Sequence, residues 1–160
     1  MNFHSNSLPL INRLSFYLLV TLSSCQNNIN NTNETLKNES IIGTWKLLSG
    51  TIIQGKDTTV TDYTINLELI KIINESHFAF MKHDLGNDSA NVFVSGGGRS
   101  TIKGTTYTEY LDFCNYREWE NNTFNFEFTI LKDTLITTGI ENIEALNINR
   151  LNIEKYVRLN

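Results

Sequence analysis

The sequence predicts an all-β domain, an antiparallel up-and-down meander that closes into a barrel of eight or nine strands. Apolar and polar residues alternate over short segments, most clearly from Thr123 to Ile130, where Phe124, Phe126 and Phe128 share one face. Turn residues separate such segments about every ten residues. Closure of the sheet would remove its exposed edges, and the roughly 120 residues available suit a barrel of this size.

The first 24 residues predict a secretory signal peptide. They contain no acidic residue, and Arg13 precedes nine mostly apolar residues, Leu14 to Leu22. This run is too short for a membrane-spanning helix, which needs about 20 residues. The run ends in Leu22-Ser23-Ser24-Cys25, which resembles a bacterial lipobox. An ordinary signal peptide, or a hydrophobic N-terminal helix that happens to precede a cysteine, is the alternative.

In the lipobox interpretation, Cys25 becomes the lipidated N-terminus of the mature protein. Its thiol would take up a diacylglycerol as a thioether, and palmitate-type acyl chains at about 0.8 kcal/mol per buried CH₂ would hold the chain on a membrane. The predicted location is therefore the bacterial cell envelope. Gln26 follows the cysteine instead of the Asp associated with inner-membrane retention, which favours the outer membrane.

Residues 25–40 predict the acylated cysteine followed by a disordered tether. Six of the fifteen residues from Gln26 to Ser40 are Asn, and only Ile29 and Leu36 are aliphatic. Such a segment has too little apolar surface to fold, and as a flexible coil it would span roughly 20 Å.

Residues 41–160 carry the alternating pattern and form the predicted barrel domain. The expected strands are, in order, Thr44–Ile52, Thr64–Ile73, His77–His83, Asn91–Ser95, Ser100–Lys103, Thr106–Cys114, Thr123–Ile130, Thr134–Gly139 and Ile148–Leu159.

Short Gly-, Asn- and Asp-containing segments separate these strands. The run Gly96-Gly97-Gly98 predicts a hairpin turn or a bulge, because it lacks the lysine and helix of a phosphate-binding loop. Helical structure is expected only as a turn before Gly43 and a short piece around Glu141–Leu146.

The start of the domain resembles that of the lipocalins and their calycin relatives, which begin their first strand with Gly-x-Trp, here Gly43-Thr44-Trp45. A closer likeness is to short lipocalin-like lipoproteins of bacteria whose function is unassigned. That likeness extends roughly from Ile41 to Arg158 and rests on the segments Gly97–Ile102, Tyr107–Tyr110, Phe113–Glu120 and Glu154–Arg158.

The resemblance implies a lipocalin-like barrel closed at one end by Gly43, Trp45 and Arg158. Gly43 permits a tight turn into the first strand, and Trp45 is large enough to plug the barrel. A basic residue near the C-terminus stacks over this indole in the family, and Arg158 is the matching residue. Trp45 as a ligand contact is the alternative.

The expected ligand-binding residues are Arg99, Tyr107, Glu109, Phe113 and Arg117. They belong to stretches that mix aromatic residues with charges of both signs. A barrel mouth lined in this way would accept an amphipathic or carboxylate-bearing ligand, with Arg99 or Arg117 as the donor. The alternative is a solvated hairpin. An inward-facing Glu109 would need a partner such as Arg99, because a lone buried carboxylate is costly.

Composition and motifs argue against several other functions. The net charge of -4, without a Lys/Arg run, argues against nucleic-acid binding. His77 and His83 would lie about 20 Å apart on one strand, so no metal site and no cofactor are expected. Cys114 shares alternation with Thr108 and Tyr110 and is interpreted as a buried structural cysteine, because no activating base is adjacent.

The sequence thus predicts a non-enzymatic, membrane-anchored protein whose barrel binds or carries a small apolar or amphipathic ligand. The alternative is a ligand-free structural or interaction module of the cell envelope, with the barrel filled by Phe78, Phe80, Phe93, Phe113, Phe124, Phe126 and Phe128. A cavity of about 300 Å³ or more would favour binding. An isomerase or hydrolase is the third hypothesis, which a buried, paired Glu109 or Arg117 in such a cavity would strengthen. Protein partners are unknown.

Overall fold

The computed structural model describes residues 40–86 and 92–160. The predicted signal peptide over residues 1–24, the proposed lipidation site Cys25 and nearly all of the predicted tether lie outside the described residues. Within the described ranges, nine strands and two short 3-10 helices follow one another: β1 (Gly43–Gln54), β2 (Asp57–Asp62), β3 (Leu67–Ile73), β4 (His77–Asp84), β5 (Phe93–Lys103), β6 (Thr106–Cys114), η1 (Arg117–Trp119), β7 (Asn122–Leu131), β8 (Thr134–Ile143), η2 (Glu144–Leu146) and β9 (Ile148–Leu159).

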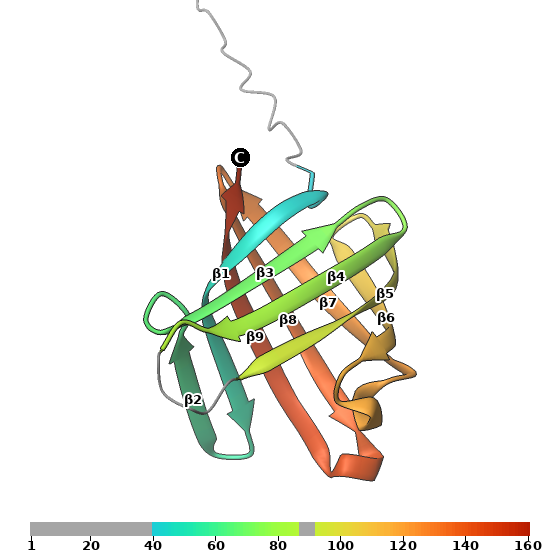
Figure 1. The fold of residues 1–160 in the computed structure, drawn as a ribbon. Helices are drawn as coiled ribbons and strands as arrows, with labels where there is room; N and C mark the ends of the chain where they lie inside the picture. The colour runs from blue at the N-terminus through green and yellow to red at the C-terminus, as the bar shows by residue number, and fades with distance from the viewer. Residues whose placement is uncertain (1–39, 87–91) are drawn as a thin grey trace, which may run out of the picture. The chain divides into compact units, whose positions relative to one another are not determined.

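The strands form an eight-stranded antiparallel barrel plus one extra strand (Figure 1). From β3 to β9 each strand pairs with the next, and β1 closes the barrel by pairing with β3 and β9. The extra strand, β2, pairs only with the second half of β1. The predicted antiparallel meander and its closure into a barrel are therefore confirmed.

The first half of β1 pairs with β3, whereas its second half leaves β3 and pairs with β2. Gly43 to Lys46 pair with β3, and Ser49 to Gln54 pair with β2. A bulge at Leu48 accompanies this change, because Leu47 opposes Tyr156 and Ser49 opposes Lys155 on β9. The bulge shifts the alternation, so that Gly50 and Ile52 face the interior with Trp45 and Leu47.

The glycine run lies inside one continuous strand, so the predicted pair Asn91–Ser95 and Ser100–Lys103 is wrong. Residues 93–95 and 100–103 both belong to β5, and Asn91 lies outside the described residues. Gly96 opposes Cys114 and Gly97 opposes Phe113, whereas Arg99 opposes Tyr110, so β6 carries one extra residue at this point. A Cβ on Gly98 would meet the Tyr110 carbonyl oxygen and lie 2.6 Å from the Asp112 nitrogen. Glycine is therefore required for the bulge, which is one of the two roles expected of this run.

Because of the same bulge, the predicted orientation of Cys114 is wrong. Beyond it the alternation of β6 changes phase, so that Cys114 is buried with Leu111 and Tyr107 while Phe113 is 70% exposed. Cys114 is a free, buried cysteine, as expected, although it does not share a face with Tyr110.

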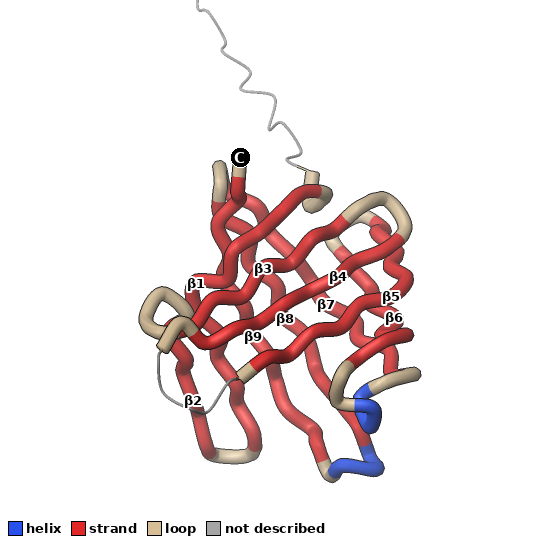
Figure 2. Tube along the Cα trace, in the orientation of Figure 1, coloured by secondary structure: helices blue, strands red, loops and turns tan. Residues whose placement is uncertain are grey.

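The two ends of the barrel are built differently. The first residues of β1 and the last residue of β9 lie at one end, and η1, η2 and the β1–β2 turn lie at the other (Figure 2). Neither helix of the described residues has the length or apolar character needed to span a bilayer.

The core contains Ile41, Trp45, Leu47, Leu69, Ile73, Phe78, Tyr107, Leu111, Cys114, Phe124, Phe126, Leu135, Ile143 and Tyr156.

This core and the closed sheet lie entirely within Ser40–Asn160. All eight barrel strands are hydrogen-bonded on both sides by strands of the same segment. A segment with its own core and its own paired strands folds as an independent unit. We therefore expect the barrel domain, Ser40–Asn160, to fold without the residues that precede it.

Candidate functional site

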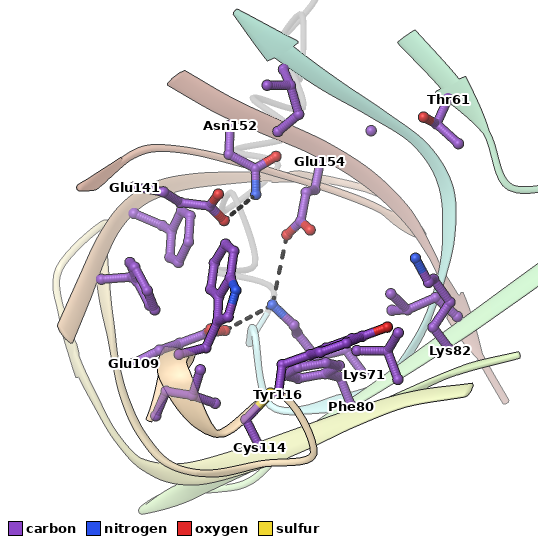
Figure 3. Close-up of a pocket in the computed structure, with 18 of the residues that line it drawn as sticks. Thr61, Lys71, Phe80, Lys82, Glu109, Cys114, Tyr116, Glu141, Asn152 and Glu154 are labelled. Atoms are coloured by element: carbon purple, nitrogen blue, oxygen red, sulfur yellow. Dashed lines mark hydrogen bonds and ion pairs between the residues drawn. The ribbon is translucent and has the colours of Figure 1, made fainter. Parts of the chain in front are cut away.

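A cavity of about 590 Å³ occupies the barrel interior and extends to η1, which contributes Glu118 and Trp119 to its lining. This volume lies within the range of about 300–1,000 Å³ that is typical of small-molecule sites. One part of its wall is apolar and aromatic: Ile52, Leu69, Phe80, Val92, Val94, Leu111, Trp119, Phe124 and Phe126. Another part is charged, and these charged side chains point toward one another across the cavity (Figure 3).

Lys71, Glu109 and Glu154 form the buried ion cluster. Nζ of Lys71 donates a hydrogen bond to Oε1 of Glu109 at 2.8 Å and lies 3.6 Å from Oε2 of Glu154. The three residues come from β3, β6 and β9, and the side chains of Lys71 and Glu109 are each only 7% exposed. A buried charge is tolerated when it is paired in this way.

Burial and charge act in opposite directions within the cluster. Burial disfavours the charged form of Lys71, but the carboxylates of Glu109 and Glu154 outweigh it and raise the pKa of the lysine. Burial raises the pKa of the Glu109 carboxyl, and the nearby Lys71 counteracts only part of that effect. Lys71 is therefore held firmly protonated, whereas Glu109 takes up a proton more readily than an exposed glutamate.

Nearby side chains form hydrogen bonds and cation–π contacts with the buried ion cluster. The Tyr156 hydroxyl donates to Oε2 of Glu154 at 2.6 Å, and the Thr137 hydroxyl donates to the same oxygen at 3.4 Å. Burial and the charge of Glu154 raise the pKa of Tyr156 well above its usual value. Nζ of Lys71 also lies 5.6–5.9 Å from the ring centroids of Phe78, Phe126 and Tyr156, within reach of cation–π attraction.

Among the described residues, two buried hydroxyls near the cluster lack a hydrogen bond of good geometry. Oγ of Ser100 lies on the residue that opposes Glu109 across the β5–β6 ladder, and the Tyr107 hydroxyl belongs to the residue two positions before Glu109. Burial and the charge of Glu109 raise the pKa of Tyr107. The barrel interior therefore has hydrogen-bonding capacity that the described side chains do not use.

A second ion pair lies closer to the mouth. Nε of Arg150 donates to Oε2 of Glu141 at 2.7 Å, and Asn152 donates to Oε1 of Glu141 at 2.8 Å. The guanidinium of Arg150 lies over the indole of Trp119, 5.3 Å from its centroid. Trp119 belongs to η1 and packs against Phe124, with ring centroids 6.3 Å apart. The segment around η1 thus contributes an aromatic side chain to the cavity mouth.

The structure places Glu109 alone among the predicted ligand-binding residues on the cavity wall. Tyr107 lies in the core near the ion cluster, and Phe113 lies on the outer face because of the β6 bulge. Arg99 is on the outer face, where it forms a forked pair with Asp112, with both N–O distances 3.0 Å. Arg117 is 83% exposed and pairs with Glu120.

The partner expected for Glu109 is also different. Lys71, not Arg99, neutralises the carboxylate, because Arg99 faces outward. Sequence reasoning missed Lys71, Glu141, Arg150 and Glu154 as cavity residues. A signal existed for Lys71, since it alternates with Leu69 and Ile73 on one face of a strand.

The three residues predicted to close the barrel lie close together at its opposite end. Trp45 is fully buried and donates from Nε1 to the Ile41 carbonyl at 2.8 Å. The guanidinium of Arg158 lies 4.1 Å from the centroid of this indole and donates to the carbonyls of Ile42 and Ser40. A side chain on Gly43 would collide with Arg158. Trp45 does not line the cavity.

Within the described ranges, no group of three or more His, Cys, Asp or Glu side chains is arranged to hold a metal ion. His77 and His83 both lie exposed on the outer face of β4. No protein-family model matches this chain, and no curated protein matches it either. The barrel and its cavity are therefore the basis for a functional proposal.

Proposed function

We propose that this protein is a lipid-anchored component of the bacterial envelope whose barrel binds or carries a small amphipathic ligand without converting it. The observation that carries this proposal is the cavity of about 590 Å³. Its volume exceeds the roughly 300 Å³ at which a barrel interior is useful for binding a small molecule. Its wall combines a broad apolar area with a few converging polar groups, which is the usual composition of a ligand site.

We also propose that the protein is lipocalin-like. The up-and-down order of the strands and the stacking of Arg158 on Trp45 beside Gly43 support this assignment. The lipid anchor rests on the sequence Leu22-Ser23-Ser24-Cys25 after an apolar run. The tether of residues 26–40 would hold the barrel at a distance from the membrane surface.

The distribution of phenylalanines argues against the alternative of a ligand-free structural module. That alternative needs a barrel filled by its own phenylalanines. Phe93 and Phe113, two of the expected fillers, are 55% and 70% exposed, and space remains beside Phe80, Phe124 and Phe126. Binding therefore accounts better for the open interior.

The buried Glu109 supports an enzyme as a second candidate. A carboxyl group with a raised pKa in a cavity is a possible general base for an isomerase or hydrolase. However, Lys71 already holds one oxygen of Glu109, and the described lining residues include no histidine to relay a proton. We therefore retain binding without turnover as the proposal.

Native mass spectrometry of the mature protein, purified from its own host, tests the proposal. A small molecule that co-purifies with the protein is expected. Val94→Trp would reduce its occupancy by filling the cavity, whereas Val60→Trp, at an exposed position outside the cavity, would not. Repeated recovery of protein without any bound molecule would contradict the proposal.

A further inference from the structure

The charges that line the cavity do not cancel. The described lining residues include four carboxylates, Glu109, Glu118, Glu141 and Glu154, but only three cations, Lys71, Lys82 and Arg150. Glu118 lies exposed at the mouth, and Lys82 is half-buried. When all of these groups are ionised, an excess of one negative charge remains on the wall, and its location decides which head group the cavity favours.

The excess lies at the buried ion cluster. Arg150 and Glu141 neutralise each other at 2.7 Å, and Asn152 bonds to the second oxygen of Glu141. Lys71, by contrast, is the single cation for both Glu109 and Glu154. It donates to Glu109 at 2.8 Å and lies 3.6 Å from Glu154, so that Glu154 is the less completely paired carboxylate.

One oxygen of Glu154 is available to a ligand. Lys71, Tyr156 and Thr137 all approach Oε2, and no described residue bonds to Oε1. The side chain points into the cavity and is only 16% exposed (Figure 3). A carboxylate with an unused acceptor and little contact with water pairs strongly with a hydrogen-bond donor that carries a positive charge.

The surrounding rings also favour a cation. Tyr63, Phe80, Trp119, Phe126 and Tyr156 line the same cavity, and the two cations Lys71 and Arg150 already lie over such rings. Ring faces attract positive charge, and this attraction is stronger where water is excluded. A negatively charged head would instead add a second unpaired negative charge beside Glu154.

From these contacts we propose that the cavity selects an amphipathic amine, whose protonated head lies against Oε1 of Glu154 and whose apolar body packs on Leu69, Phe80 and Phe124. This inference rests on the proposed binding function and names the ligand class. It differs from the carboxylate-bearing ligand that the sequence suggested, because Arg99 and Arg117 lie outside the cavity.

Titration calorimetry of the barrel domain, Ser40–Asn160, with octylamine, octanol and octanoate at neutral pH tests the inference. Octylamine is expected to bind at least about tenfold more tightly than octanol, and octanoate more weakly than both. Glu154→Gln keeps the shape of the side chain and is expected to lower the affinity for octylamine to about that for octanol, which removes the amine preference. Glu144→Gln, the same change at an exposed position in η2, should leave the preference intact.

The outcomes separate the two proposals. Octanoate binding as tight as octylamine binding, or an amine preference that persists in a folded Glu154→Gln variant, would overturn the inference while octanol binding still supports a ligand cavity. If none of the three probes binds, both the inference and the proposed function fail. The ranking of the three probes on the unmodified domain decides the matter even if Glu154→Gln does not fold.

Discussion

Nζ of Lys71 lies 2.8 Å from Oε1 of Glu109, although the two residues are 38 positions apart and belong to strands that do not neighbour each other in the sheet. The pair therefore spans the barrel interior. Both side chains are almost completely buried, and Glu154 approaches the same lysine from a third strand. This contact places opposite charges inside the cavity, and we expect the stability of the barrel to depend on each partner.

Removing the lysine alone should be costly. Lys71→Met leaves Glu109 and Glu154 buried without their cation, which we expect to lower the free energy of unfolding by about 3–5 kcal/mol. Urea denaturation of the barrel domain measures the change. The control is Lys46→Met, which breaks the half-exposed pair with Glu68 and should cost less than about 1 kcal/mol. Equal effects of the two substitutions would contradict the role assigned to the buried pair.

Stability should fall steeply in alkaline solution. Lys71, Tyr107 and Tyr156 all have a pKa raised in the folded protein, so the folded chain keeps protons that the unfolded chain releases above about pH 10. The free energy of unfolding then decreases as pH rises, by about 1.4 kcal/mol per pH unit for each group. Urea denaturation at several pH values should show a shallower decrease for Tyr156→Phe, and an unchanged slope would refute the assignment.

The bulge opposite Gly98 should not tolerate a side chain. In Gly98→Ala, the new Cβ would meet the backbone of Tyr110 and Asp112, which cannot move without disrupting the β5–β6 ladder. We expect a loss of at least about 2 kcal/mol in thermal or urea denaturation. Gly104→Asn is the comparison, because Gly104 has a φ of +60° but open space around it, and asparagine tolerates that conformation at a cost below about 1 kcal/mol.

Arg158 should stabilise the closed end through Trp45. Arg158→Ala removes a guanidinium that lies 4.1 Å from the indole centroid and two hydrogen bonds to the chain before β1. The expected loss is about 1–3 kcal/mol, accompanied by a change in tryptophan fluorescence. Arg99→Ala, which removes an exposed arginine from the outer face, should change stability by less than about 1 kcal/mol. If Arg99→Ala were as damaging, the closure role would be wrong.

If the proposed lipid anchor is attached at Cys25, replacing this cysteine should release the protein from the membrane. Full-length Cys25→Ser, produced in the native host, should lose its acyl chains and leave the membrane fraction, since a serine oxygen cannot form the thioether. Cell fractionation and the intact mass of the protein measure both effects. Cys114→Ser changes the other cysteine, which is buried in the barrel, and should leave the protein on the membrane. Retention of the Cys25→Ser protein with an unchanged mass would argue against lipidation.

Much of the fold could be predicted because a strand with one buried face alternates apolar and polar residues over a few positions. Alternation in Thr123–Ile130 predicted β7, and turn residues located most strand boundaries. β2 was missed because Asp57–Asp62 is polar and almost wholly exposed, so it has no buried face to create alternation. A break between two strands was predicted at the glycine run because glycine is common in both turns and bulges. Only the pairing of β5 with β6 shows that the run forms a bulge.

The site was less accessible to prediction, since its contacts join distant strands. Glu109 was identified because its segment mixes aromatic residues with charges of both signs, but its partner depended on which residue faces it across the interior. The bulge between Leu111 and Phe113 reversed the faces expected for Phe113 and Cys114. A single extra residue changes such assignments because alternate residues face opposite sides of a sheet.

By itself, the sequence determined the strand-rich domain, and it predicted a closed end formed by Gly43, Trp45 and Arg158 and a lipid anchor at Cys25. Local patterns carry this information, because alternation, turn residues and a signal segment are each readable within a few positions. Only the tertiary structure decided that a cavity remains and that Lys71, Glu109 and Glu154 meet inside it. Packing volume and burial of charge depend on which strands face one another across the barrel, and chain order alone does not specify that.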